Sequence, residues 1–158
     1  DEKKEKYHVR LAWIFFIIYM IFLMYFLFFA EITGRTYVDR DYHYNLVPFR
    51  EIKRFIRYRE SLGWFAVGTN LFGNVIVFLP YGAILPILIK KSRNFFRITL
   101  YSFEFSLFVE IVQLVSKVGS FDVDDLFLNT LGGAIGYLIF LLICHFGREK
   151  YEKTKKTL

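Results

Sequence analysis

Polar side chains recur at helical spacing inside a segment that is otherwise apolar. Ser102, Ser106, Glu110, Gln113 and Lys117 stand at positions i, i+4, i+8, i+11 and i+15. At about 100° per residue, this spacing places them on one stripe of a helix. An ionisable group in apolar surroundings marks a candidate functional site. Glu110 is therefore a candidate general acid or base.

The neighbouring segments carry polar groups that match this stripe. Asp125 and Asn129 share one side of a helix with Gly132 and Gly136, and these two glycines form a small-x-x-x-small pattern that lets two helix backbones approach closely. An earlier segment places two asparagines one turn apart. If these stripes face one another, they enclose a single polar pocket. The residues expected to line it are Asn70, Asn74, Glu110, Gln113, Asp125 and Asn129.

An acidic cluster, Asp122, Asp124 and Asp125, precedes the last apolar segment. One interpretation is that these residues cap the next helix and complement its dipole. The alternative is a cation site, because carboxylate oxygens are the ligands that Mg²⁺ and Ca²⁺ prefer. We expect no cofactor unless the cation-site alternative holds, in which case Asp122, Asp124 and Asp125 are the candidate ligands of a divalent cation. Asp125 is also a candidate catalytic residue.

The elements that position these groups are four apolar segments of membrane-spanning length. The composition is 55% hydrophobic, and residues 11–30 contain no charge. About 20 residues at about 1.5 Å each match a hydrocarbon layer of about 30 Å. The sequence predicts an all-α polytopic integral membrane protein that forms a single domain over residues 1–158. The expected spans are about 11–30, 66–89, 97–117 and 125–146.

The distribution of Lys and Arg predicts the orientation in the membrane. Thirteen lie in the N-terminal tail, the 90–97 connection and the tail after Phe146, and eight lie in the other two connections. Cytoplasmic loops carry the excess of these residues. We therefore expect a multi-pass protein with both termini in the cytoplasm, and a pocket that opens to the outside.

A fifth helix is expected at about residues 48–60, in the long connection between the first two spans. Phe49, Ile52, Phe55 and Ile56 recur at helical spacing among basic residues. Basic amphipathic helices of this kind lie in the interface and favour anionic headgroups. A solvated helix that packs on the bundle is the alternative. The candidate headgroup-binding residues are Lys53, Arg54 and Arg57.

The order and spacing of these residues resemble the VanZ-like family. The resemblance rests on Asn45-x-x-Pro48-Phe49, Asn70-x-x-Gly73-Asn74-(x)3-Phe78-x-Pro80-x-Gly82, Glu110-x-x-Gln113 and Asp122-x-Asp124-Asp125-(x)3-Asn129-x-x-Gly132-Gly133-(x)2-Gly136. It covers about residues 45–137. The chain departs from the family's pattern where Gly119 and Ser120 replace an arginine just ahead of the acidic cluster, so that Lys117 is the nearest cation.

The resemblance implies a small bacterial cell-membrane protein whose namesake raises resistance to the lipoglycopeptide teicoplanin. It does not imply a particular reaction. The family's polar positions, carried over residue by residue, add Asp122 and Asp124 to the pocket. The full set is Asn70, Asn74, Glu110, Gln113, Asp122, Asp124, Asp125 and Asn129.

Three functions compete. The first is a non-enzymatic resistance protein that reduces drug binding at the outer face or interacts with lipid-linked cell-wall precursor. The second is an intramembrane enzyme for a lipid-linked substrate, with Glu110 as general acid or base and a divalent cation on the acidic cluster. The third is a small cation-coupled transporter. Membrane lipids are the expected partners, and the basic residues flank membrane spans rather than form a nucleic-acid site.

The orientation can be tested by thiol labelling. In a Cys144→Ala background, cysteines replacing Arg57 and Ser120 should react with a membrane-impermeant thiol reagent in intact cells. Both positions lie in connections assigned to the outer side. Labelling that appears only after lysis would invert the topology.

Overall fold

The chain forms four long helices joined by short ones, with a minimal pair of strands at one end. The structure, a computed structural model, describes residues 2–32, 42 and 44–157. The elements are α1 (Glu2–Ile32), β1 (Tyr44–Asn45), α2 (Arg50–Arg57), α3 (Arg59–Leu62), α4 (Trp64–Leu88), the 3₁₀ turn η1 (Lys90–Ser92), α5 (Phe95–Ser116), β2 (Phe121–Asp122) and α6 (Val123–Thr157).

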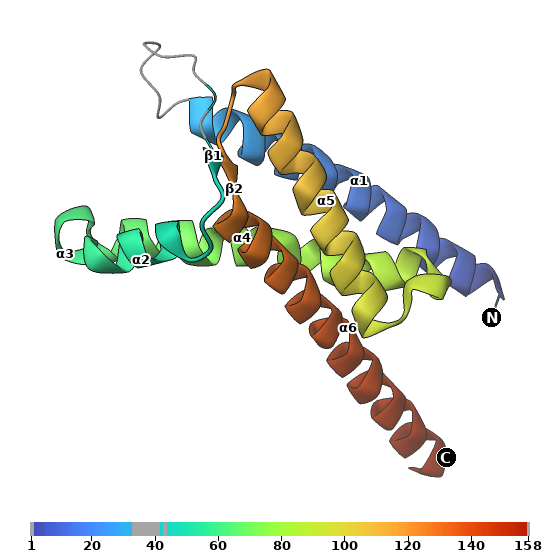
Figure 1. Cartoon of the computed structure of the whole chain (residues 1–158). Coiled ribbons are helices and arrows are strands. Elements are labelled where there is room, and N and C mark those ends of the chain that lie inside the picture. Colours follow the sequence, from blue (N-terminus) through green and yellow to red (C-terminus); the bar gives the residue numbers. More distant parts are fainter. Residues whose placement is uncertain (1, 33–41, 43, 158) are drawn as a thin grey trace.

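Four helices in the described part of the chain are long and apolar enough to cross a membrane. Their candidate spans are Lys6–Phe28, Val67–Leu88, Phe95–Ser116 and Val123–Gly147. These match the four predicted spans, and the all-α polytopic class is confirmed. Helices α1 and α6 extend beyond their spans at the chain termini. In Figure 1 both termini lie at the lower right, away from the strands.

Helices α4 and α6 make the most extensive contact in the bundle and cross in the middle of the molecule (Figure 1). Their close approach depends on glycines. A Cβ atom at Gly132 would overlap the carbonyl oxygen of Val75, and one at Gly136 would overlap that of Leu79. The predicted small-x-x-x-small pattern therefore lies in the α4–α6 contact, where it lets the two backbones touch.

Apolar side chains fill the space around this crossing in two clusters. One contains Tyr81, Ile98 and Phe140, and the other joins α1 to α4 and α5 through Leu23, Phe78 and Val109. Helix α1 is the least buried of the four spans. A polar contact also attaches it, because the Tyr19 hydroxyl donates to the Val77 carbonyl oxygen over 2.8 Å. Without water to compete, such contacts help to hold helices together in lipid.

The helix expected at about 48–60 is present as two short helices rather than one. Pro48 lies in the turn before α2, which begins only at Arg50, and Tyr58 separates α2 from α3. Phe49 adopts a left-handed conformation with φ 62°. The two short helices project from the bundle beside the start of α4 (Figure 1). Apolar spacing alone does not reveal a break of this kind, because both helices continue the same pattern.

Replacing Gly136 with alanine should destabilise the bundle. The new methyl group would overlap the Leu79 carbonyl oxygen, and overpacking of this kind typically costs about 1–3 kcal/mol. Thermal unfolding of the purified protein in detergent should show a clear loss. Gly147→Ala is the matched control, because a Cβ atom there meets nothing within 4 Å. Equal melting of both variants would show that α4 and α6 do not touch at Gly136.

Candidate functional site

A pocket of about 400 Å³ lies where all four long helices meet α2. Helices α1 and α5 end here, and α4 and α6 begin here, so the pocket lies at the end of the bundle opposite the two termini. All eight residues predicted for a pocket belong to its lining: Asn70, Asn74, Glu110, Gln113, Asp122, Asp124, Asp125 and Asn129. Asn70 is exposed, whereas Glu110 and Asn129 are almost completely buried.

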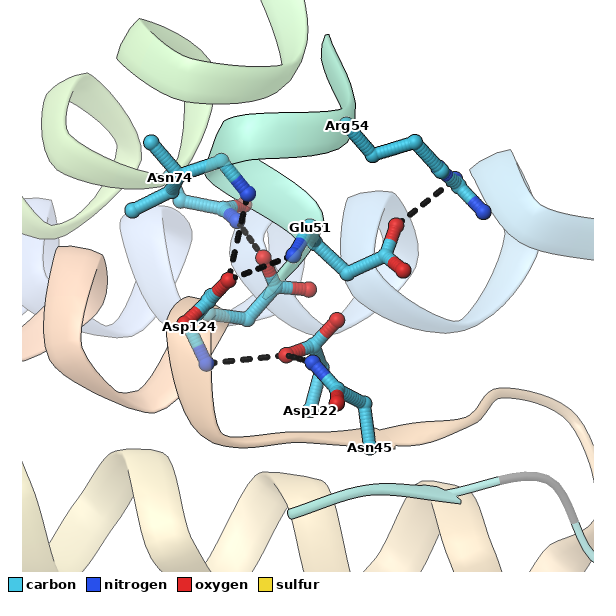
Figure 2. Close-up of polar contacts among 8 residues, drawn as sticks. Asn45, Glu51, Arg54, Asn74, Asp122 and Asp124 are labelled. Carbon is cyan, nitrogen blue, oxygen red and sulfur yellow. Dashed lines mark hydrogen bonds and ion pairs between the residues drawn. The ribbon is translucent and has the colours of Figure 1, made fainter. Parts of the chain in front are cut away.

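Asp124 caps a helix other than its own. Its Oδ1 atom accepts from the backbone N–H of Phe49 over 2.5 Å. Its Oδ2 atom accepts from the N–H groups of Glu51 over 2.8 Å and Ile52 over 3.1 Å. The first N–H groups of a helix have no partner within it, and the side chain of Phe49 cannot supply one. A carboxylate from the start of α6 therefore holds the N-terminus of α2 at the pocket (Figure 2).

Asp122 is the centre of a second set of hydrogen bonds, close to the first. Its Oδ1 atom accepts from Asn45 Nδ2 over 3.1 Å and from the Asp124 N–H over 2.8 Å (Figure 2). Its own N–H donates to Glu110 Oε2 over 2.9 Å. The parallel pairing of β1 with β2 places Asn45 opposite Asp122. Burial raises the pKa of Asp122, and the hydrogen bonds from Asp124 and Asn45 oppose that shift.

Two side-chain amides join helices across the pocket. Asn74 Nδ2 donates to Asp125 Oδ1 and connects α4 with α6. Gln113 Nε2 donates to the Leu27 carbonyl oxygen over 2.9 Å and connects α5 with α1. Each bond satisfies a polar group at membrane depth, where an unmade hydrogen bond is expensive. The polar stripes therefore also hold the four helices together at this end.

Asn129 connects α6 with α5, and, within the described part of the chain, one of its side-chain atoms is an unpaired acceptor. Its Nδ2 atom donates to Ser106 Oγ over 2.9 Å. The side chain is only 1% exposed. Its Oδ1 atom is buried and has no hydrogen-bond partner among the described residues. Buried side-chain acceptors are usually paired, so this one calls for an explanation.

The acidic cluster is divided among several contacts. Asp124 faces α2, Asp125 faces α4, and Asp122 faces β1. Within the described residues, no three His, Cys, Asp or Glu side chains are grouped so that they could hold a metal ion. Asp122 caps the start of α6 by accepting from the Asp124 N–H, as the capping interpretation expects, whereas Asp124 caps α2 instead.

The basic residues of α2 lie at the rim of the pocket. Arg54 lines it, pairs with Glu51 at 2.6 Å and lies 5.3 Å from the centre of the Phe55 ring. Lys53 and Arg57 are exposed. Lys117, the cation nearest to the position of the family's arginine, does not line the pocket. Its Nζ atom lies 4.4 Å from the centre of the Tyr42 ring.

Asn45 is the residue whose role the sequence analysis missed. It belongs to the Asn45-x-x-Pro48-Phe49 motif, but the sequence did not predict that it contributes to the site. Its Nδ2 atom binds Asp122, and its Oδ1 atom accepts from the Val47 N–H over 3.1 Å. It therefore shapes the turn that leads into α2. The sequence pattern that indicates this role is an asparagine a few residues before a helix whose own N-cap residue, Phe49, has no side-chain hydrogen-bond acceptor. Glu104, by contrast, is exposed on α5 and contributes nothing to the pocket lining.

These features define a polytopic membrane protein whose polar pocket is lined in part by a short basic helix. The sequence model of the VanZ/LLP1 family matches residues 16–144, and the chain belongs to this family. A curated relative, Protein VanZ of Enterococcus faecium, is 29% identical over 110 residues, which are 69% of this chain and 60% of the relative. The chain thus spans about 60% of the length of that relative. No solved structure matches with statistical significance.

Removing the Asp124 carboxylate should release α2. Asp124→Ala leaves the N–H groups of Phe49, Glu51 and Ile52 without their acceptor, and losing an N-cap costs about 0.5–2 kcal/mol. Hydrogen exchange of the amides in residues 49–57 should accelerate roughly tenfold. Asp125→Asn is the control, because it keeps an acceptor for Asn74 and leaves the Asp124 carboxylate in place. Equal protection of residues 49–57 in both variants would contradict the proposed cap.

Proposed function

We propose that this protein contributes to resistance against lipoglycopeptide antibiotics such as teicoplanin by binding phosphate-bearing headgroups at the outer face of the bacterial cell membrane. Occupied headgroups, including those of lipid-linked cell-wall precursor, would offer fewer sites to the drug. Membership in the VanZ/LLP1 family and the similarity to Protein VanZ support resistance as the biological role. The distribution of Lys and Arg supports an outward orientation of the pocket.

The observation that carries the proposal is the attachment of α2 to the pocket. Helix α2 has four basic residues and one acidic residue, and none of its side chains is buried. Asp124 holds its N-terminus, so the basic side chains are presented at a fixed place beside the opening. Each basic residue near an anionic membrane surface contributes about 1 kcal/mol to binding. A helix held in this way suits the binding of phosphate headgroups.

The bonds of the carboxylates favour binding over catalysis. A general acid or base must reach the proton that it moves. Asp124 instead accepts three backbone N–H groups, and Glu110 accepts from the backbone of Asp122. These contacts position elements of the fold. They therefore give Asp124 and Glu110 a role that a non-enzymatic protein would also need.

Neutralising the rim should weaken resistance. We expect Lys53→Gln, Arg54→Gln and Arg57→Gln together to lower the minimal inhibitory concentration of teicoplanin, because about 3 kcal/mol of headgroup attraction is removed. The measurement is a susceptibility assay on cells that express each variant at matched membrane abundance. Glu110→Gln and Asp125→Asn should cause a smaller, partial loss.

A charge-preserving variant provides the control. Lys53→Arg, Arg54→Lys and Arg57→Lys keep the positive charge at the rim and should keep most of the resistance. If the neutral triple variant is as resistant as the unmodified protein, headgroup binding by α2 is excluded. Complete loss from Glu110→Gln alone, at unchanged abundance, would favour an intramembrane enzyme, because losing a general acid or base typically costs about 10²-fold or more.

A further inference from the structure

We propose that the pocket binds the primary ammonium group of an amine-bearing phospholipid, while the phosphate of the same lipid lies at the basic rim of α2. The inference rests on the proposed function, in which α2 faces phosphate headgroups. It adds the part of the ligand that enters the protein. Two independent features of the pocket carry it, a buried acceptor and an excess of acidic lining.

The buried acceptor is Asn129 Oδ1. Its amide is oriented by the bond from Nδ2 to Ser106 Oγ, and the side chain is a part of the pocket lining. Its Oδ1 atom is buried and has no donor among the described residues. Leaving a buried acceptor unpaired costs free energy, so a ligand that brings an N–H or O–H donor gains a hydrogen bond at no loss to the protein. A donor from a ligand in the pocket would supply the partner that this acceptor lacks.

The acidic lining selects a cationic donor. Five carboxylates line the pocket, against the single guanidinium of Arg54. Two amide donors of the same lining, Asn74 Nδ2 and Gln113 Nε2, already bind protein acceptors. The surface offered to a ligand is therefore rich in acceptors and negative in formal charge. An ammonium group has three N–H donors and a positive charge, and it needs both kinds of partner when it leaves water.

The arrangement of charge across the pocket indicates a zwitterionic headgroup. Arg54 lies on the rim next to Lys53, whereas Glu110 and Asn129 belong to the deeper wall and are 2% and 1% exposed. A phosphate bound at the rim would direct the amine of the same headgroup inward. The cavity of about 400 Å³ lies within the range of about 300–1,000 Å³ that is typical of ligand pockets. The acyl chains would remain in the surrounding bilayer.

Native mass spectrometry of the purified full chain in detergent can test this inference. The probes are phosphatidylethanolamine and phosphatidylcholine with identical acyl chains, added at equal concentration. Both are zwitterionic and carry the same phosphate, but the quaternary amine of phosphatidylcholine has no N–H donor. We expect about tenfold greater retention of phosphatidylethanolamine, which corresponds to one hydrogen bond to a charged group. Equal retention of the two lipids would overturn the proposal.

Two variants and a control assign the preference to the pocket. Asn129→Leu removes the acceptor and should abolish the preference for the primary amine. If this variant does not fold, Asp125→Asn serves instead, because it lowers the negative charge and keeps an acceptor for Asn74. Thr130→Val is the matched control, since the Thr130 hydroxyl binds Leu126 in its own helix and does not line the pocket. A preference that survives both Asn129→Leu and Asp125→Asn would overturn the proposal.

Soluble phosphoethanolamine distinguishes a lipid from a free metabolite. It should not displace the bound lipid at equal concentration, because it lacks the acyl chains that add apolar contacts to those of the headgroup. Displacement would assign the pocket to a soluble amine and overturn the lipid assignment. The assay contains no antibiotic. Equal lipid retention, together with lost resistance in the neutral α2 variant, would therefore reject this inference and leave the proposed function standing.

Discussion

The carboxylate of Asp124 joins α6 to the start of α2 at the polar pocket. It accepts three backbone N–H groups at the start of α2, a helix that has no capping side chain of its own. Phe49, the residue before α2, also packs on Phe127 of α6. The basic rim of the pocket depends on α2 being in this place.

Burying polar groups at the pocket end of the bundle costs free energy, and almost all of these groups are paired by hydrogen bonds. Asn74, Gln113 and Asn129 each donate to a different helix, so the bonds replace interactions that water would otherwise provide. The glycine contact of α4 with α6 joins the middle of the bundle, and apolar packing around Tyr81, Ile98 and Phe140 joins it farther from the pocket. Polar contacts therefore concentrate at the pocket end of the bundle. Among the described residues, Asn129 Oδ1 is the buried side-chain polar atom without a hydrogen-bond partner.

Helical periodicity predicted the four spans and six polar residues of the pocket lining, whereas Asp122 and Asp124 were added by the family resemblance. Residues such as Glu110 and Gln113 lie on one helix, so their shared face follows from local geometry. The cap by Asp124 could not be predicted in this way, because it joins groups 75 residues apart and depends on the packed bundle. The interruption at Tyr58 was not predicted, because α3 contains a single apolar residue, Leu62, and is too short to show a pattern of its own. The exposure of Asn70 could not be predicted from spacing, because it depends on how the helices pack around the start of α4.

The long separation between Asp124 and the start of α2 also has a consequence for biosynthesis. A chain is made from its N-terminus at roughly 5–20 residues per second, so the ribosome needs several seconds to add the 75 residues between Phe49 and Asp124. During that delay, the N–H groups at positions 49, 51 and 52 lack the carboxylate that accepts from them in the folded protein. The turn before α2 is therefore completed late, after the last membrane helix has begun to emerge, and a nascent chain that stops after α5 would carry its basic segment unattached.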